Sequence, residues 1–411
     1  MGGNASRPTS NTVIKLAQPG EDNQPMLDAC IAAVVELQPD FKAAKAHRIS
    51  GGITNCLVRI DAAEGSSPAC HMLVRIFGEV GSRFSDRNYE HKCAITLAEG
   101  GLAPEIYGMG ANFRLEGWLA GRVPLEAEQC LENDKLALVG AKLCEFHQVK
   151  MKPRVSSHSK DTGEFWYQLN HTLQLVKECG EIDWIDLKAI EAELDYFRTL
   201  FPPGQSADYI AKREIGNFAS QIRDRQWRAQ EFLFRIGFVH FDLLGGNIMY
   251  DEAKKDVMFI DFDYVSHAPI GVDIGNHFRA IMETALIDTG ELDLKMFPNK
   301  EQQYVWLRSY IAQGKKMGAK NFDQYEDCLE EIYNTLSMFC MIACLRWCMW
   351  GIVQSTVPSD FDYRNYSTKI FDLEYQYHKK RFISTRPAKI HSLDGKANDN
   401  PSKGSGYPSK Y

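Results

Sequence analysis

Two short apolar segments, 238–240 and 257–260, interrupt a stretch of the chain that is otherwise patterned for helices. The polar residues at or just after their ends are His240, Asp242, Asn247, Asp261 and Asp263. Because the strands of a hairpin bring their ends together, we expect these side chains to face one cleft. Asp, Gly and Asn favour turns anywhere, so each residue alone means little. The joint pattern H-x-D-x-x-x-x-N followed by I-D-F-D is far more specific and limits what the chain can fold into.

This hairpin matches the needs of phosphoryl transfer from a nucleotide to an alcohol. The reaction needs a carboxylate that takes the hydroxyl proton and oxygen ligands for a metal ion on the triphosphate. We expect Asp242 to orient and deprotonate the alcohol as the catalytic residue. Asn247 and Asp261, with Asp263 beside them, are the expected ligands of the metal. The sequence therefore predicts an enzyme that uses ATP and Mg²⁺.

The spacing of apolar residues differs on the two sides of residue 118. Before it, one helix is expected near 27–37 and another over 86–99, with strands over 56–60, 71–77, around 106 and over 113–118. After it, apolar residues at helical spacing predict helices over 134–148, 165–179, 186–200, 212–236, 300–313, 326–355 and 366–381. We therefore expect an α+β fold with a small β-rich N-lobe (26–118) and a large helical C-lobe (119–383). Residues 1–25 and 384–411 are polar and are expected to be mobile.

Composition excludes several classes of protein. The formal net charge is −7 and no long Lys/Arg cluster appears, which argues against nucleic-acid binding. The sequence contains no uninterrupted apolar run of about 18 residues, so a transmembrane helix is not expected. Eleven cysteines occur without a C-x-x-C pair, so neither structural zinc nor a disulfide framework is expected. Cys340, Cys344 and Cys348 could form a thiol face, but three small apolar residues on a buried helix is the favoured interpretation. Reduced thiols indicate a cytoplasmic protein.

With these motifs the chain resembles the choline/ethanolamine kinase family, whose fold is like that of protein kinases and aminoglycoside phosphotransferases. The resemblance is carried by Asp261-Phe262-Asp263-Tyr264 through 273–278 (D-I-G-N-H-F), and by 298–301, 306–310 and 345–354. It covers about residues 45–382. Gly52-Ile53-Thr54-Asn55 and Leu243-Leu244 look more like the ethanolamine branch. The resemblance implies a protein-kinase-like two-lobe fold and an ATP:amino-alcohol phosphotransferase that supplies phosphoethanolamine or phosphocholine for phospholipid synthesis.

The resemblance also implies where ATP binds. Gly51, Gly52 and Asn55 are similar in position to the family's phosphate-covering loop. Arg75, within an apolar strand, occupies the position of the cationic residue beneath that loop. An unpaired Arg there would be costly, and Glu90 on the next helix matches its usual partner. The alternative is a surface Arg on an edge strand. Glu116 to Leu119, including Trp118, fall at the lobe connection, where adenine would bind.

The expected amine pocket contains Trp347 and Trp350, which share one helix face, with Phe361. Aromatic faces attract alkylammonium cations. A Trp pair on an apolar helix can equally be plain core, and the family match favours the pocket. One position departs from the family, because Ala280 stands where a Glu is usual. The pocket therefore lacks its usual carboxylate, unless Glu283, one turn further on, supplies it. Ethanolamine, choline or both thus remain open as substrates.

Other features concern partners and alternatives. The start Met-Gly-Gly-Asn-Ala-Ser fits the pattern for myristoylation of Gly2, which alone gives only weak, reversible association with membranes. A homodimer is compatible with the sequence. A kinase of a larger aminated compound such as an aminoglycoside, and a non-catalytic amine-binding protein, are the two alternatives to an amino-alcohol kinase. A protein kinase is disfavoured because no A-P-E-like segment follows Asp261.

Overall fold

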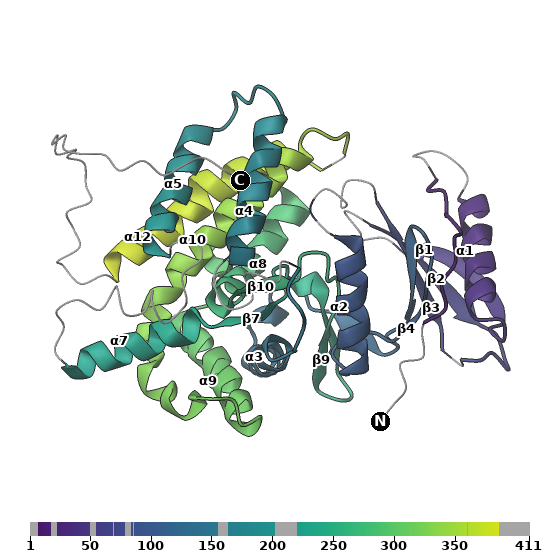
Figure 1. The fold of residues 1–411 in the computed structure, drawn as a ribbon, viewed down its shortest axis with the longest axis horizontal. Coiled ribbons are helices and arrows are strands. Elements are labelled where there is room, and N and C mark those ends of the chain that lie inside the picture. Colours follow the sequence, from purple (N-terminus) through teal and green to yellow (C-terminus); the bar gives the residue numbers. More distant parts are fainter. Residues whose placement is uncertain are drawn as a thin grey trace.

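The computed structural model of the chain describes residues 7–17, 23–49, 55–68, 70–78, 84, 86–154, 163–201, 220–359 and 361–385. Figure 1 shows two parts, a smaller one built on a sheet and a larger helical one. Gly2, Gly51, Gly52 and residues 386–411 lie outside the described residues, so the expectations for them stay predictions. The division at residue 118 also stays a prediction.

The N-lobe is built on a five-stranded antiparallel sheet with the strand order β1-β2-β3-β5-β4. Its strands are β1 (Ala43–Ile49), β2 (Asn55–Ala62), β3 (Met72–Phe77), β4 (Ile106–Met109) and β5 (Phe113–Gly117). Val58, Ile60 and Val74 point into the core with almost no exposed surface. The sequence did not predict β1, since its alternating pattern is blurred by lysine, histidine and arginine on an edge strand.

Two helices cover opposite faces of this sheet (Figure 1). Helix α1 (Gln24–Leu37) begins with a proline in its first turn and buries Met26, Cys30 and Val34 against the sheet. Helix α2 (Arg87–Glu99) is capped by the Asp86 side chain, which accepts bonds from two backbone amides. Its buried residues belong to the core of the C-lobe, so α2 joins the two lobes.

The amino-terminal segment 7–17 corrects the expectation of a mobile extension over 1–25. The Ser10 amide donates to the Met109 carbonyl (2.9 Å), and the Met109 amide donates to Pro8 (3.1 Å). Ile14 is buried in the N-lobe core. A polar composition suggested mobility, but an unpaired sheet edge offers backbone partners that composition cannot reveal.

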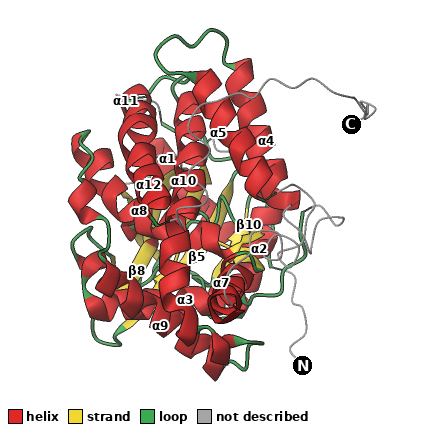
Figure 2. Ribbon diagram, turned by 90° about the vertical axis from the view of Figure 1, so that its left-hand side faces the viewer, coloured by secondary structure: helices red, strands yellow, loops and turns green. Residues whose placement is uncertain are grey.

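The C-lobe is mostly helical, and in Figure 2 its helices face the reader with the strands lying behind them. Its helices are α3 (Asn133–His147), α4 (Gly163–Glu178), α5 (Leu187–Leu200), α7 (Ser220–Leu233), α8 (Ile270–Thr289), α9 (Lys300–Lys316), α10 (Leu329–Gln354), α11 (Tyr363–Lys369) and α12 (Gln376–Ser384). Its strands are β6 (Arg122–Pro124), β7 (Ile236–Val239), β8 (Ile248–Asp251), β9 (Asp256–Phe259) and β10 (Ser266–Pro269). The helix expected over 366–381 is confirmed as one continuous helical run, in which a π-helical stretch, Ile370–Tyr375, connects α11 to α12.

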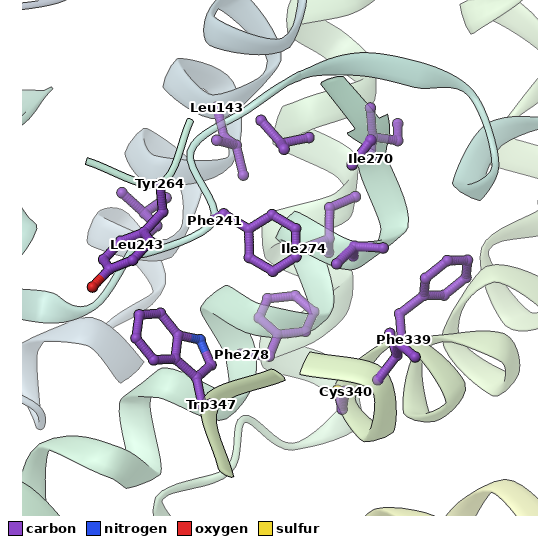
Figure 3. Close-up of a cluster of buried hydrophobic side chains, with 14 of the residues drawn as sticks. Leu143, Phe241, Leu243, Tyr264, Ile270, Ile274, Phe278, Phe339, Cys340 and Trp347 are labelled. Carbon is purple, nitrogen blue, oxygen red and sulfur yellow. The ribbon is translucent and has the colours of Figure 1, made fainter. Parts of the chain in front are cut away.

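Helix α10 forms the centre of the C-lobe. Segment Glu326–Gln354 is long and apolar enough to cross a membrane by length and composition, but its most apolar window is entirely buried within the protein. Cys340, Cys344 and Cys348 are buried there, as the core interpretation predicted. A side chain at Gly275 of α8 would lie 2.8 Å from the Cys340 amide, so glycine permits the close approach of α8 to α10. Figure 3 shows the apolar side chains packed at this junction.

Candidate active site

A cavity of about 630 Å³ lies between the N-lobe sheet and the C-lobe. The predicted site residues that line it are Asn55, Arg75, Glu116, Trp118, Asp242, Asn247, Asp261, Glu283, Trp347, Trp350 and Phe361. Glu90 and Asp263 are buried and are not among its lining residues. We call the part with Arg75, Asp242, Asn247 and Asp261 the phosphate end. The amine end is the part with Tyr264, Glu283, Trp347, Trp350, Phe361 and Tyr366.

The loop after β7 brings Asp242 and Asn247 together. The Asn247 amide nitrogen donates to the backbone oxygen of Asp242 (2.7 Å) and to its carboxylate (3.2 Å). This arrangement leaves the amide oxygen of Asn247 as the atom that can serve a cation. The His240 ring contacts the backbone oxygen of Ile260 (3.0 Å), which ties this loop to the end of β9 just before Asp261. The hairpin expected between segments 238–240 and 257–260 is wrong, because β7 pairs with β10 and β9 pairs with β8. Both carboxylates nevertheless line the same cavity.

Helix α8 holds the backbone of this loop. The Asp273 carboxylate accepts bonds from the backbone amides of His240 (2.7 Å) and Phe241 (2.8 Å). Burial alone would raise the pKa of Asp273, but hydrogen bonding from His147 holds it below its usual value. Farther along the helix, the His277 ring donates to the Leu243 carbonyl (2.9 Å). The D-I-G-N-H-F run therefore acts locally as an anchor for the loop, a role that its sequence did not reveal.

Strain in the loop is concentrated beside the carboxylates. Phe241 and Asp261 have φ angles of 67° and 65°, which are unusual for residues other than glycine. Such conformations persist only where surrounding contacts enforce them, and they cluster at functional sites. Two hydrogen bonds hold the backbone of Phe241 in this conformation. Its amide donates to the Asp273 carboxylate, and its carbonyl accepts from the Asn276 side chain.

The two carboxylates of the phosphate end have raised proton affinity. Burial raises the pKa of Asp242 well above its usual value, and the neighbouring carboxylate of Asp261 raises it further. Burial also raises the pKa of Asp261, opposed by the Arg75 guanidinium. A cation held between them would lower both pKa values, because it stabilises the ionised carboxylates.

The ion pairs that cross this end of the cavity differ from the expected one. Arg75 donates to Glu116 (3.0 Å) and to Asp261 (3.3 Å), so it links the N-lobe to the hairpin. Glu90 pairs instead with Arg114, whose guanidinium also holds Glu116 (2.8 Å). The expected direct Arg75–Glu90 pair is therefore wrong. Arg114, next to Arg75 on the neighbouring strand, takes that place. Sequence reasoning missed Arg114 because only the cross-strand register makes it a neighbour.

Asp263 has protein partners on two sides. Its carboxylate accepts a bond from Arg87 (2.8 Å) and lies 3.4 Å from the Asn55 amide nitrogen. These contacts join α2 and the start of β2 to the hairpin. Asp261 and Asn247, which line the cavity, are therefore better placed for a cation than Asp263.

The residues of the phosphate end fit a nucleotide and a metal ion. Two carboxylates and an amide oxygen are the hard oxygen donors that divalent cations such as Mg²⁺ prefer. The buried Arg75 supplies positive charge for phosphate, and its pKa, which burial alone would lower, is raised by Glu116 and Asp261. The cavity volume lies within the usual range for small-molecule sites, ~300–1,000 Å³.

The amine end is an aromatic cage. Trp347 and Trp350 meet edge to face with ring centroids 5.3 Å apart. The Trp350 ring nitrogen donates to the Tyr264 hydroxyl (2.8 Å), and the Trp347 nitrogen donates to Asn276 (2.8 Å). Figure 3 shows Trp347 and Tyr264 side by side next to Phe241. The pocket interpretation of the Trp pair is thus favoured, since both rings line the cavity with their polar atoms already bonded.

The structure also places the carboxylate of this end. Glu283 lines the cavity, whereas Ala280 is buried on the same helix and is not among the described lining residues. The expectation that position 280 faces the pocket is therefore not supported. Glu283, one turn further on, provides the acidic group.

Behind Glu283 lies a buried ion-pair network. Arg279 donates to Glu283 (2.7 Å) and to both oxygens of Glu374 (2.6 and 2.9 Å). Cys344, Glu374 and His378 have potential metal-ligand atoms within 4.8 Å of one another. Since Arg279 occupies both oxygens of Glu374, we assign this group to the ion-pair network.

Arg346 is a further charged residue that sequence reasoning missed. Its guanidinium lies 3.9 Å from the ring centroid of Phe241, 4.9 Å from Tyr264 and 5.1 Å from Trp347. Burial lowers the pKa of Arg346 to about 10, so it stays protonated at neutral pH. Its charge opposes the rise in the pKa of Asp242. The guanidinium of Arg346 therefore packs against the ring of Phe241.

A small sheet lobe over a helical lobe, with carboxylates and a buried cation at one end of the cavity between them, defines a kinase of small molecules. The family model for choline/ethanolamine kinase matches residues 46–375. The chain belongs to the choline/ethanolamine kinase family.

Individual relatives agree with this assignment. The chain is 25% identical over 358 residues to a probable ethanolamine kinase of Nematostella vectensis, covering 86% of this chain and 93% of that protein. It is 26% identical over 353 residues to probable choline kinase 3 of Arabidopsis thaliana, covering 85% and 90%.

Solved structures show the same fold. An ethanolamine kinase of Plasmodium vivax matches with a TM-score of 0.60 at 21% identity, covering 90% of this chain and 91% of that one. A choline kinase of Cryptosporidium parvum matches with a TM-score of 0.65 at 19% identity, covering 85% and 92%. The α+β, protein-kinase-like two-lobe fold predicted from the sequence is confirmed.

Proposed function

We propose that this protein transfers the γ-phosphoryl group of ATP to the hydroxyl of ethanolamine or choline. The observation that carries the proposal is the single cavity with carboxylates and Arg75 at its phosphate end and an aromatic cage at its amine end. The first end suits a nucleotide with a divalent cation, and the second suits an alkylammonium group. Relatives named ethanolamine kinase and choline kinase support the same activity.

The residues of the phosphate end divide the chemistry between them. The alcohol oxygen forms a bond to the γ-phosphorus while the bond to the bridging β–γ oxygen breaks and ADP leaves. Asp242 accepts the hydroxyl proton, which its buried carboxylate with raised proton affinity can hold. Asn247 and Asp261 would hold the cation, which we propose is Mg²⁺ and which neutralises charge on the phosphates. Arg75 places a fixed positive charge beside them.

The nucleotide base is assigned to the lobe connection after β5. Gly117, Trp118 and Leu119 all line the cavity. The Trp118 amide already donates to the His71 carbonyl (2.9 Å), so we assign the contact with adenine to the backbone that follows it, at Leu119. Gly51 and Gly52 remain the proposed phosphate-covering residues.

The two alternatives are not favoured. Curated relatives are named for ethanolamine and choline, which argues against a larger aminated substrate. A non-catalytic amine-binding protein would not need Asp242, Asn247 and Asp261 gathered in one cavity.

The test is ADP formation with the full chain over a panel of ethanolamine, choline and an aminoglycoside, with Mg²⁺ and with a chelator. We expect one phosphorylated amino alcohol for each ADP, and no turnover with the chelator. Turnover confined to the aminoglycoside, or binding of the amines with no ADP formed, would overturn the proposal.

A further inference from the structure

The carboxylate at the amine end is already committed to protein partners. One oxygen of Glu283 accepts a bond from Arg279 (2.7 Å), and the other accepts a bond from the Tyr366 hydroxyl. Glu283 is itself buried, with 5% of its surface exposed. Each oxygen of Glu283 therefore has one protein donor already, which leaves about half of the carboxylate's lone-pair sites for an ammonium group.

Arg279 is held in the position from which it donates to Glu283. It has no exposed surface, and Glu374 accepts bonds from two of its nitrogens (2.6 and 2.9 Å). Such paired bonds fix the guanidinium in one orientation, with its remaining nitrogen aimed at Glu283. Arg279 cannot lose its proton at any ordinary pH, so the negative charge of Glu283 is always partly neutralised.

This arrangement affects primary and quaternary amines differently. A primary ammonium carries three N–H donors that must find acceptors when water is removed. A trimethylammonium group has no such donors and needs only aromatic faces and diffuse negative charge. Because Glu283 already accepts two bonds and shares its charge with Arg279, it binds a primary ammonium more weakly, and this penalises the primary amine more.

The remainder of the amine end suits the methylated group. Trp347, Trp350 and Phe361 supply ring faces and edges to the cavity. The nitrogens of both tryptophans are bonded to Asn276 and Tyr264, so these rings stay fixed. The cage thus offers apolar surface that N-methyl groups can cover.

We infer that Arg279 and Tyr366 are specificity-determining residues that hold Glu283 away from a primary amine, so that the enzyme prefers choline and other N-methylated amino alcohols to ethanolamine. This inference rests on the proposed function and narrows its substrate. It separates this chain from its relatives, several of which are named ethanolamine kinase.

The first experiment needs no variant. The full chain with MgATP is assayed with ethanolamine and its mono-, di- and trimethylated forms. We expect kcat/KM to rise with each methyl group, to about tenfold or more for choline over ethanolamine, the ratio that one lost charge-assisted hydrogen bond produces. A kcat/KM for ethanolamine equal to or above that for choline overturns the inference while leaving the proposed function intact. No turnover of any amine overturns both.

Tyr366→Phe tests the cause. The variant keeps the ring but removes the hydroxyl that donates to Glu283, so one carboxylate oxygen becomes free. We expect the choline-to-ethanolamine ratio to fall by about tenfold, the effect of restoring one hydrogen bond to a charged group. Tyr363→Phe, on the same helix and outside the cavity lining, is the matched control and should leave the ratio unchanged. An unchanged ratio in Tyr366→Phe, or equal changes in both variants, overturns the role of Glu283.

Discussion

The phosphate end and the amine end of the cavity are built in different ways. Asp242, Asn247 and Asp261 at the phosphate end come from one short segment of the C-lobe, and Arg75 comes from the N-lobe. Backbone hydrogen bonds to α8 fix the loop that carries them. The amine end gathers Tyr264 and side chains from α8, α10 and α11, with Phe361 just before α11. Its rings are fixed mainly by packing against one another.

This difference in construction separates two properties of the enzyme, the chemistry of phosphoryl transfer and the choice of amine. The chemistry of phosphoryl transfer depends on a few oxygen atoms at set positions, so a short motif with backbone anchors is sufficient. Recognition of an amine depends on the balance of ring faces, acceptors and charge, which changes when a single partner such as Arg279 is present. We therefore propose that the phosphate end defines the reaction and that the amine end selects the substrate.

Asp242→Asn is expected to give the largest effect and tests the phosphate end. The amide keeps the shape but cannot accept the hydroxyl proton, so kcat should fall by about 10²–10⁴-fold. KM for ATP should change little, because the assigned role concerns the alcohol. Steady-state kinetics with MgATP decides the matter, and a variant that keeps more than about a tenth of the wild-type kcat removes Asp242 as the base.

Asp261→Ala tests the cation that the phosphate end would hold. Loss of a ligand should raise the Mg²⁺ concentration for half-maximal activity by at least about tenfold, since loss of a partner to a ligand already costs that much. Asp256→Ala, in the same hairpin but paired with Arg122, is the control and should leave the requirement unchanged. If the two variants need the same Mg²⁺ concentration, Asp261 is not a metal ligand.

His277 makes the anchor of the phosphate end sensitive to acid. Burial lowers the pKa of His277 to about 4, because protonation would place a charge on a ring nitrogen that has no partner. In the unfolded chain the pKa is about 6.5, so the unfolded state binds the proton first as pH falls. The contribution of His277 to the free energy of unfolding should thus be fully present above pH ~6.5 and should be lost as the pH falls towards ~4. The total loss from this group is up to about 3 kcal/mol.

The matched variant for this prediction is His277→Asn, whose amide can still donate to Leu243 but does not titrate. Denaturant unfolding between pH 7 and 4.5 should show a shallower loss of stability in the variant. Equal slopes in the two proteins would show that His277 is not the group that responds.

Trp350→Ala has the smallest expected effect and tests the amine end. Loss of one ring face should raise KM for the amine by about 5- to 30-fold, corresponding to ~1–2 kcal/mol, with little change in KM for ATP. Trp184→Ala, at a partly buried tryptophan outside the cavity lining, controls for general destabilisation. A fall in melting temperature without a change in KM would make Trp350 a core residue only.

The sequence by itself determined the polar residues of the loop and most of the helices. The spacing of Asp242, Asn247 and Asp261 was informative because all three lie within one short segment of chain. The pairing of the strands was not determined, because β7 pairs with β10 and β9 pairs with β8. Helices α3, α5, α9 and α10 were predicted within a few residues, since their apolar periodicity is a local property. Strand β1 was missed because lysine, histidine and arginine blur its alternating pattern. The strands β6, β8 and β10 were missed because they have only three or four residues each.

Only the tertiary structure decided which charged and aromatic side chains meet. Glu90 pairs with Arg114 because antiparallel register sets Arg114 beside Arg75. Glu283 faces the cavity and Ala280 does not, which depends on how α8 is rotated against its neighbours. Such contacts join residues far apart in sequence, and their energies depend on burial and on partners supplied by other elements. A sequence shows which groups are present, but packing determines the distances at which charge and hydrogen bonding act.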